Sequence, residues 1–247
     1  MLSVPVLVYL LKYPTDIATG YSLFIVGTAA LIGGLAFINR GDISFESLIQ
    51  FAIPSILTVY IVRKFVIPVM PEILYSNGNF QISKQIFIMF LFAFLMLVSS
   101  VLMIRKQKKN NRKDIVWEEF AKSPVRIYLV ILLAIFVGFI TGLVGAGGGF
   151  IIIPVLIFFL RVPVKKAIGT SLAIIALNSL IGFTGNFGNF EIDWKFLLSV
   201  TLICIAGILF GNLISAKIPA QKLKPAFGWF TLIVGIFVII KEIQFLK

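Results

Sequence analysis

The hydrophobic pattern of the chain is a series of long apolar stretches separated by short polar loops. The longer stretches approach or reach the roughly 20 residues that an α-helix needs to cross about 30 Å of hydrocarbon. They are residues 17–39, 48–62, 85–104, 126–144, 167–186, 195–216 and 226–240. This pattern predicts an all-α polytopic membrane protein with about six or seven spans.

Two shorter apolar stretches, residues 1–11 and 150–160, cannot cross a bilayer alone at a helical rise of about 1.5 Å per residue. Each is followed by a short loop that contains a proline, Pro14 or Pro163. The second also follows a run of small residues, 145–149 (GAGGG), that is expected to break a helix. A broken backbone is tolerated inside a membrane only where it is buried in protein or lines a cavity. The sequence therefore predicts broken, re-entrant half-helices at both places.

An internal repeat relates the two halves of the chain. Residues 2–34 align without a gap with residues 151–183, and 13 of these 33 positions are identical. The identities include proline, glycine and serine, so apolar composition alone does not explain them. Pro5 matches Pro154, and we expect both to be structural residues of the short helices. The predicted units are an N-terminal repeat over 1–104, a cytoplasmic linker over 105–125 and a C-terminal repeat over 126–247.

The distribution of charge gives these helices an expected orientation. Only 13% of the residues are charged and 60% are hydrophobic, whereas a soluble domain carries about 25% charged residues. The net charge of +12 lies mostly in short loops, which is typical of cytoplasmic loops in membrane proteins. Residues 105–126 hold eight basic and three acidic side chains, and 161–166 and 217–225 are also basic. The loop 187–194 carries only acidic charges, so we expect it on the opposite side.

This charge rule predicts that the two repeats are inverted. Every loop of the second half obeys the rule if 126–144 enters from the cytoplasm and 150–160 returns toward it. Working back from a cytoplasmic linker then gives the first half the opposite sense, as in many secondary transporters. Arg63 and Lys64 fall in an outer loop in this interpretation, and we treat them as a tolerated exception.

The same symmetry predicts a segment before the first residue. The second half has a helix and a glycine break at 126–149, whereas the first half begins inside its short helix. A matching unit would add about 25 residues upstream. We expect a start assigned too late or a fragment of a longer chain.

The chemistry available to the chain is narrow. It contains no histidine and one cysteine, Cys204, which excludes an intrachain disulfide. It has no protease, hydrolase or metal-ligand motif, so we predict no enzymatic activity, no cofactor and no metal site. No basic face interleaved with aromatic residues is evident, so we predict no nucleic-acid partner. No acidic or basic side chain lies in the central part of a predicted span, so the sequence offers no proton relay.

Neutral polar groups are therefore the candidates for a binding site. The run 145–149 precedes a half-helix whose amino end would point free N–H groups at the bilayer midplane, and such an end is a ready anion site. The half-helix at 2–11 would aim at the same place, and hydroxyl and amide side chains, including Thr28 and Ser179, follow both. The predicted substrate-binding residues are Gly145, Gly147, Gly148, Gly149, Thr170, Ser171, Asn178, Tyr21 and Ser22.

Helix packing is the alternative explanation for these residues. Glycine in membrane helices often permits only close contact, and serine or threonine often bonds its own backbone. For Ser22 and Ser171 packing is the simpler interpretation. Five small residues in a row at 145–149 break a helix rather than pack it, which favours a functional loop. Asn178 stays open between the two, because an amide is costly to bury without partners.

The stretch GFITGLVGAGGGFIIIPVLIFFLRVPVKKAIGTSLAIIALNSLIG (138–182), with its degenerate copy at 1–33, resembles the TauE/SafE family of sulfite exporters. The resemblance covers essentially the whole chain and rests on the pattern G-x-G-G-G…P-x-L…A-x-G-T/Y-S-L. The chain departs from the family by lacking the first copy of the helix and glycine loop. The family motifs fall here on Gly145, Gly147, Gly148, Gly149, Pro154, Gly169, Thr170, Ser171, Asn178, Pro5, Tyr21 and Ser22.

The resemblance implies a bacterial cytoplasmic-membrane transporter of sulfite, organosulfonates or related small sulfur-containing anions, with two inverted repeats. We expect export by alternating access, driven by the anion gradient and the membrane potential, because no carboxylate lies deep in a predicted span. The expected partners are membrane lipid and a small oxyanion substrate, and a homo-oligomer stays open. The alternative is a non-transporting accessory membrane subunit or an inactive fragment.

Overall fold

The computed structural model describes residues 2–77, 80–104, 124–160, 162–215 and 220–245. The long helices are α2 (Thr15–Asn39), α3 (Phe45–Ile61), α5 (Lys84–Ile104), α7 (Pro124–Val144), α9 (Val164–Thr184), α10 (Trp194–Ser215) and α11 (Ala220–Phe245). The short elements are α1 (Ser3–Pro5), η1 (Val6–Leu10), η2 (Val62–Val66), α4 (Ile67–Val69), α8 (Gly149–Phe158) and the strands β1 (Ile73–Asn77) and β2 (Phe80–Ser83). Both η elements are π-helical turns that continue a preceding α-helix.

The described helices confirm the predicted all-α polytopic membrane protein. Seven of them are long and apolar enough to cross a membrane by length and composition. The outer surface agrees with this, since Leu202, Ile203 and Phe210 on α10 are 66–72% exposed. Lipid tails are as apolar as these side chains, so an outward apolar face is what a membrane helix presents.

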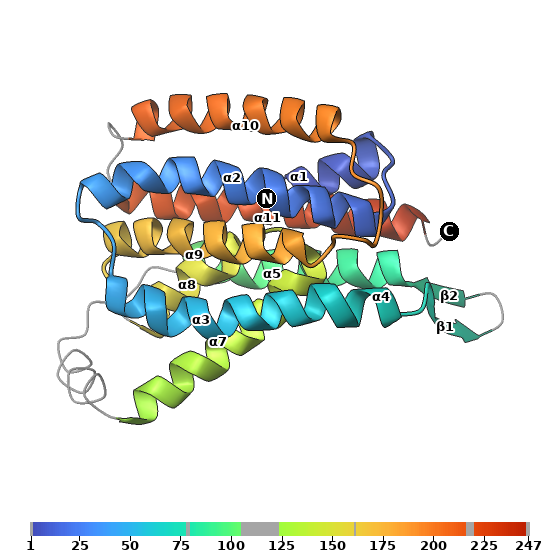
Figure 1. Ribbon diagram of the computed structural model, residues 1–247, viewed down its shortest axis with the longest axis horizontal. Coiled ribbons are helices and arrows are strands. Elements are labelled where there is room, and N and C mark those ends of the chain that lie inside the picture. Colours follow the sequence, from blue (N-terminus) through green and yellow to red (C-terminus); the bar gives the residue numbers. More distant parts are fainter. Residues whose placement is uncertain (1, 78–79, 105–123, 161, 216–219, 246–247) are drawn as a thin grey trace.

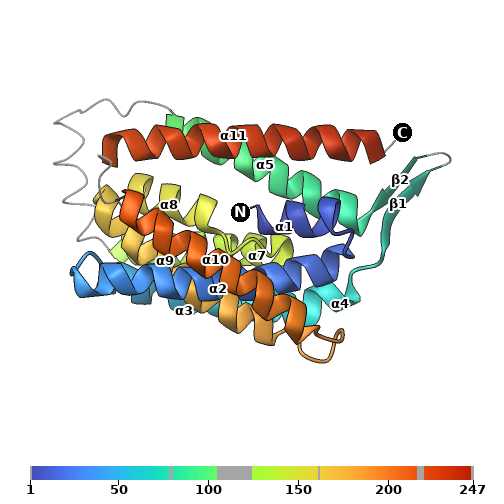
Figure 2. The ribbon, with the colours of Figure 1, turned by 90° about the horizontal axis from the view of Figure 1, so that it is seen from above.

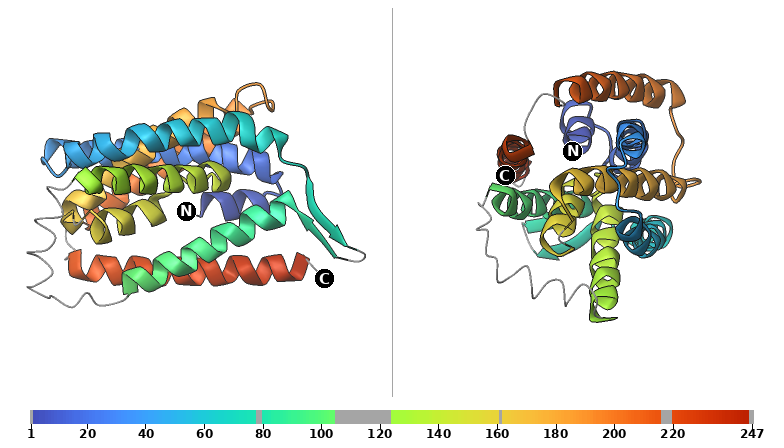
Figure 3. Two further views of the ribbon diagram at one scale, coloured as in Figure 1. Left: turned by 90° about the horizontal axis from the view of Figure 1, so that it is seen from below. Right: turned by 90° about the vertical axis from the view of Figure 1, so that its left-hand side faces the viewer.

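The long helices run roughly along one axis and pack in pairs that are distant in sequence (Figure 1). Helix α5 packs against α11, α2 against α9, and α3 against both α7 and α9. Helix α10 lies at one edge, where α2 is its main partner (Figure 3, right). Contacts between the two halves of the chain therefore hold the bundle together.

Glycines allow the closest of these contacts. A Cβ on Gly138 of α7 would lie 2.6 Å from the carbonyl oxygen of Ser55 on α3. A Cβ on Gly142, one turn later, would lie 2.8 Å from the Cβ of Val62. Any larger residue would separate α3 from α7, so small residues set this helix–helix distance.

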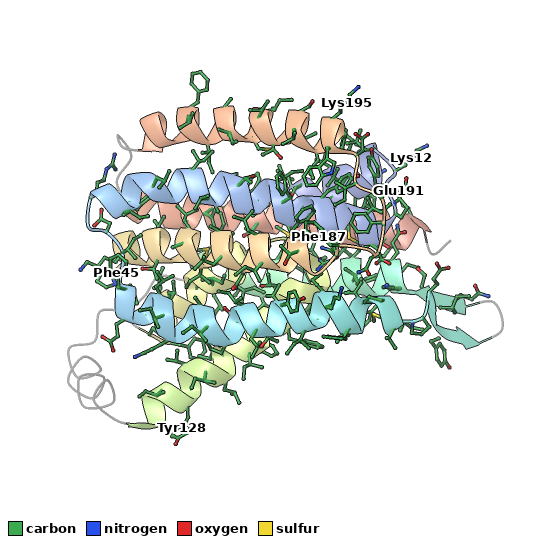
Figure 4. All side chains as sticks on the ribbon, in the orientation of Figure 1. Lys12, Phe45, Tyr128, Phe187, Glu191 and Lys195 are labelled. Carbon is green, nitrogen blue, oxygen red and sulfur yellow. The ribbon has the colours of Figure 1, made fainter. Side chains whose placement is uncertain are left out.

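The loops between helices gather at the two ends of the bundle. Phe45 and Tyr128, at the starts of α3 and α7, lie at one end (Figure 4). Lys12, Glu191 and Lys195 lie at the other end (Figure 4). The acidic loop before α10 is thus on the opposite side from the start of α7, as the charge pattern predicted.

The break predicted at residues 145–149 is present. Helix α7 ends at Val144 and α8 begins at Gly149. Helix α8 then turns back toward the end from which α7 started (Figure 1). The pair is a re-entrant hairpin, and α9 makes the full crossing that follows it.

The short helices α1 and α8 begin near the middle of the bundle and run in opposite directions. In Figure 2 the amino terminus lies between them, α1 runs toward the end that carries β1 and β2, and α8 runs toward the other end. Their amino ends therefore approach one another at mid-height. The inversion of complete repeats stays a prediction.

The assignment of Arg63 and Lys64 to an outer loop is wrong. The second span does not end at residue 62 but continues through the π-helical turn η2 into α4, so that Phe45–Val69 forms one candidate span. Arg63 is completely buried, whereas Lys64 is exposed. Apolar residues return after the two charges, and a π-helical turn rotates Arg63 into the protein without ending the helix.

A β-hairpin after α4 was not predicted. Strands β1 and β2 are antiparallel, with Asn77 opposite Phe80 and an irregularity between Ile73 and Tyr75. The hairpin projects from the end of the bundle beyond α5 (Figure 1). The segment is too short and too polar to form a membrane span, so the sequence pattern assigned it to a loop.

Candidate functional site

The glycine loop, residues 145–148, owes its shape to backbone angles that glycine alone adopts readily. The φ angles are +69° at Gly145, +70° at Gly147 and +67° at Gly148. Residues with a Cβ are strained in this left-handed region. The N–H of Gly145 donates to the carbonyl of Thr141 at 2.9 Å and closes the last turn of α7, after which the loop reverses the chain.

The loop delivers the amino end of α8 to the interior of the bundle. Gly148 is the N-cap residue, and its carbonyl accepts from the N–H groups of Ile151 and Ile152, both at 2.9 Å. The N–H groups before Ile151 have no acceptor within the helix. Together with the helix dipole they give this end about half a positive charge, which favours an anion.

Two buried hydroxyl groups without hydrogen-bond partners lie against the glycine loop at this end, and the neighbouring Asn178 is incompletely hydrogen-bonded. Thr141 and Ser179 are 1% and 0% exposed, and neither hydroxyl has a partner. Thr141 Oγ1 lies against Gly148, where an added Cβ would collide with it, and Ser179 Oγ is 3.1 Å from the position of a Cβ on Gly147. Asn178 accepts from Ser55 Oγ at 3.0 Å through Oδ1, and its Nδ2 has no partner. Hydroxyl and amide groups of this kind are donors for an oxyanion.

A cavity of about 510 Å³ connects the amino ends of the two half-helices. Ser3 of α1 and Gly149 of α8 both line it. The remaining lining comes from α2, α9 and α10, from the glycine loop and from η1 with the residues that flank α1 and η1. It is almost entirely apolar: Leu2, Val6, Leu7, Leu11, Ile25, Val26, Ala29, Ala30, Ala146, Leu172, Ile175, Val200, Cys204 and Ile208. An apolar cavity with polar groups at two points can orient a small ligand without holding it tightly.

Ser22 occupies the α1 side of this arrangement. It is completely buried, and its Oγ lies 2.7 Å from the Oγ of Ser3, which lines the cavity. The structure thus brings Ser22 to the amino end of α1, as the half-helix prediction required. Pro5 lies within α1 and Pro154 within α8, and both are buried.

Of the nine predicted binding residues, only Gly149 lines the cavity. The other eight are not part of its lining: Gly145, Gly147, Gly148, Thr170, Ser171, Asn178, Tyr21 and Ser22. Thr170 Oγ1 accepts from the backbone N–H of Ser44 at 2.9 Å and ties α9 to the loop before α3. Ser171 Oγ donates to the carbonyl of Ile168 in its own helix at 2.8 Å.

Tyr21 also serves the scaffold. Its hydroxyl accepts from the N–H of Asp193 at 2.8 Å, and its ring packs on Phe190 and Phe196. Tyr21, Thr170 and Ser171 therefore hold the ends of the helices in place rather than forming the site.

Sequence reasoning missed two residues of the loop environment, Thr141 and Arg63. Thr141 precedes the glycine loop by one helical turn, and that spacing is the signal that could have identified it. Arg63 was assigned to a loop although apolar residues follow it. Its Nη1 donates to Thr19 Oγ1 at 3.0 Å, and its guanidinium touches Gly145.

Charged groups also lie beside the short helices. Lys84 forms an ion pair with Asp16 at 2.9 Å and donates to the carbonyl of Ile67 at 2.7 Å. Glu242 of α11 is 1% exposed and accepts from Tyr9 Oη at 2.5 Å. In the part of the chain that the structure describes, no three His, Cys, Asp or Glu side chains gather as metal ligands would.

Comparisons with known proteins agree with this architecture. The family model described as Sulfite exporter TauE/SafE matches residues 1–238. A "Probable membrane transporter protein" of Xylella fastidiosa strain 9a5c is 29% identical over 97% of this chain and 86% of its own length. The "Probable membrane transporter protein YunE" of Bacillus subtilis is 26% identical over 82% of this chain and 71% of its own.

A further relative comes from an archaeon. The "Probable membrane transporter protein MJ0441" of Methanocaldococcus jannaschii is 33% identical over 47% of each chain. No solved structure matches the chain.

Proposed function

The chain belongs to the TauE/SafE sulfite exporter family of membrane transporters, and from this premise we propose that it exports a small sulfur-containing oxyanion, sulfite or an organosulfonate, across the bacterial cytoplasmic membrane. The cavity between the amino ends of α1 and α8 is the proposed substrate site. The observation that carries the proposal is the meeting of unpartnered donors at the amino end of α8.

The chemistry of that end suits an oxyanion. The first N–H groups of α8 and the hydroxyls of Thr141 and Ser179 are donors without acceptors in this structure. An oxyanion supplies several acceptor lone pairs, so one ligand satisfies several of them at once. Neutral donors bind an anion less tightly than a buried lysine would, which allows release on the other side of the membrane.

The apolar walls of the cavity suit an anion that passes through rather than one that is held there. Only Ser3 and the backbone near Gly149 bring polar groups to the cavity surface that α1 and α8 share. The glycine loop offers a point at which the backbone can change shape, because positive φ angles at three of its residues leave many conformations open. Alternating access then requires movement of the α7–α8 hairpin relative to α2 and α9.

The direction of transport follows from charge. Helices α7, α9 and α11, which follow the basic stretches of the sequence, begin at the same end of the bundle, and this end is proposed to face the cytoplasm. An inside-negative potential then favours anion exit by about 2.3 kcal/mol per charge per 100 mV.

Reconstitution of the purified chain into proteoliposomes tests the proposal. Vesicles loaded with sulfite should release it faster than protein-free vesicles, and release should speed up when a potential that is negative inside is imposed. Sulfite flux equal to that of protein-free vesicles, with correctly inserted protein, would favour the accessory-subunit alternative instead.

A further inference from the structure

Arg63 sits at the junction of three elements next to the glycine loop. Helix α3 and the turn η2 carry it inward, where its guanidinium touches Gly145 at the end of α7 and Thr19 of α2. A Cβ on Gly185, at the end of α9, would lie 2.9 Å from the Cβ of Arg63. Arg63 is 0% exposed and is among the largest fully buried side chains of the protein.

The hydrogen bonds of this guanidinium are incomplete. Nη1 donates to Thr19 Oγ1 at 3.0 Å, but Nε and Nη2 have no partner. Buried polar groups are satisfied in the large majority of cases. Nε and one Nη together form the fork that binds an oxyanion with two parallel hydrogen bonds.

The charge of Arg63 is only partly compensated. Asp16 lies close enough to attract the guanidinium, but its carboxylate is 47% exposed and already pairs with Lys84 at 2.9 Å. Among the described residues, no carboxylate forms an ion pair with Arg63. Arg63 and Lys84 therefore share one carboxylate, that of Asp16, and one positive charge stays unneutralised inside the protein.

An uncompensated buried charge is costly, and a purely structural role does not require one. The single hydrogen bond to Thr19 could be made by a neutral amide at lower cost. A buried guanidinium is useful where a negatively charged ligand arrives to complete it. The guanidinium lies against Gly145 at the start of the glycine loop, and Ala146 and Gly149 of the same segment line the substrate cavity.

We propose that Arg63 is the charge-selecting residue of the transporter, which supplies the fixed positive charge that admits oxyanions to the glycine loop and disfavours cations and neutral solutes. This inference rests on the proposed function, because it assigns the charge preference of that same site. In this role Nε and Nη2 bind the anion when the glycine loop moves and Gly145 no longer lies against the guanidinium.

The first test replaces the charge and uses an adjacent residue as control. Arg63→Gln removes the charge, Arg63→Lys keeps it without the fork, and Lys64→Gln removes an exposed charge from the same turn. Sulfite binding to purified protein is measured by calorimetry, and sulfite release is measured from proteoliposomes. Arg63→Gln should weaken sulfite binding at least about tenfold, Arg63→Lys less, and Lys64→Gln less than about twofold.

The second test neutralises Arg63 without removing it. Thr19→Asp gives the guanidinium the carboxylate that it lacks, and Thr19→Asn is the uncharged control of similar size. Thr19→Asp should keep or raise the thermal unfolding midpoint, since it completes a buried ion pair. It should nevertheless weaken sulfite binding about as much as Arg63→Gln does, whereas Thr19→Asn should not.

The outcomes separate the two proposals. Wild-type protein that binds sulfite but releases none overturns the transport function and leaves the assignment of Arg63 standing. Equal sulfite binding by wild type, Arg63→Gln and Thr19→Asp overturns the assignment, whatever the flux. If Arg63→Gln does not fold, the comparison of Thr19→Asp with Thr19→Asn decides.

Discussion

Three buried polar side chains with unpartnered atoms lie against the glycine loop, and at the scale of single residues they define the candidate site. They are Arg63, Thr141 and Ser179. They come from the π-helical turn after α3, from α7 and from α9. In a helix bundle that binds no ligand each of them would only lower stability, because a buried polar group without a partner destabilises the fold by about 1–3 kcal/mol. Their concentration at one loop is therefore the strongest sign of a ligand.

Removing the hydroxyls at the loop should weaken anion binding while leaving the fold intact. Thr141→Val and Ser179→Ala each delete one unpartnered donor, and each should weaken sulfite binding about fivefold, as expected for one neutral hydrogen bond. Calorimetry on the purified variants measures the affinity. Thr184→Val is the control, since that exposed hydroxyl already donates to the carbonyl of Ile181. Unchanged sulfite affinity in both variants would exclude these hydroxyls from the site.

Filling the glycine loop should stop transport. In Gly148→Leu the side chain would enter a left-handed position, which costs about 1–2 kcal/mol, and its Cβ would collide with Thr141 Oγ1. We expect insertion into the membrane to persist and sulfite flux in proteoliposomes to be lost. Gly207→Leu on α10 is the matched control, because nothing lies near its Cβ position. Wild-type flux in Gly148→Leu would remove the loop from the mechanism.

At the scale of elements, the two half-helices give the cavity its polar ends and α10 gives it a wall. Val200, Cys204 and Ile208 recur at helical spacing and line the cavity, whereas Leu202 and Ile203 are turned outward. Helix α10 has few other partners in the bundle. A chemical label on α10 is therefore well placed to detect a ligand in the cavity.

The single cysteine of the chain, Cys204, provides a site for such a label. Cys204 lines the cavity, so an organosulfonate such as methanesulfonate bound there should slow its reaction with a small methanethiosulfonate reagent, whereas sulfite would itself consume the reagent. The rate is followed by mass spectrometry with increasing methanesulfonate. In a Cys204→Ala background, Leu202→Cys places a thiol on the outward face, and its labelling should not respond to methanesulfonate. Equal protection at both positions would contradict a ligand in the cavity.

At the scale of the whole molecule, the path has no evident proton carrier at its centre. Glu242 is buried, but it lies near the end of α11, where it accepts from Tyr9 beside the outer part of η1. The apolar lining of the cavity contains no carboxylate among the described residues. This apolar lining agrees with the proposal that the protein carries an anion down its electrochemical gradient.

Transport should accordingly depend on voltage rather than on a pH gradient. An imposed potential of 100 mV adds a driving force of about 2.3 kcal/mol per charge, so sulfite release from proteoliposomes should rise with the potential at equal pH on both sides. Glu242→Gln should retain flux within about twofold, like the exposed control Glu72→Gln. A strict requirement for a pH gradient at fixed potential, lost in Glu242→Gln, would establish proton coupling through Glu242 instead.

The sequence by itself determined the membrane class, the positions of the spans and the break at 145–149. These properties depend on local composition: a long apolar run must satisfy its backbone as a helix in lipid, and consecutive glycines cannot continue one. It also selected Gly147 and Gly148, which lie in the loop before α8, and Ser22, which contacts Ser3 of α1. Their role in substrate binding stays a prediction.

Only the tertiary structure decided which polar side chains have partners. The sequence placed Thr170, Ser171 and Tyr21 beside Asn178 among the candidate binding residues, yet their hydroxyls bond to neighbouring backbone. Arg63 reads as a loop cation until α2, α7 and α9 close around it. Hydropathy along a chain gives the average preference of each residue type for lipid or water. Whether a side chain finds a hydrogen-bond partner or a counter-charge depends on which distant helices pack around it.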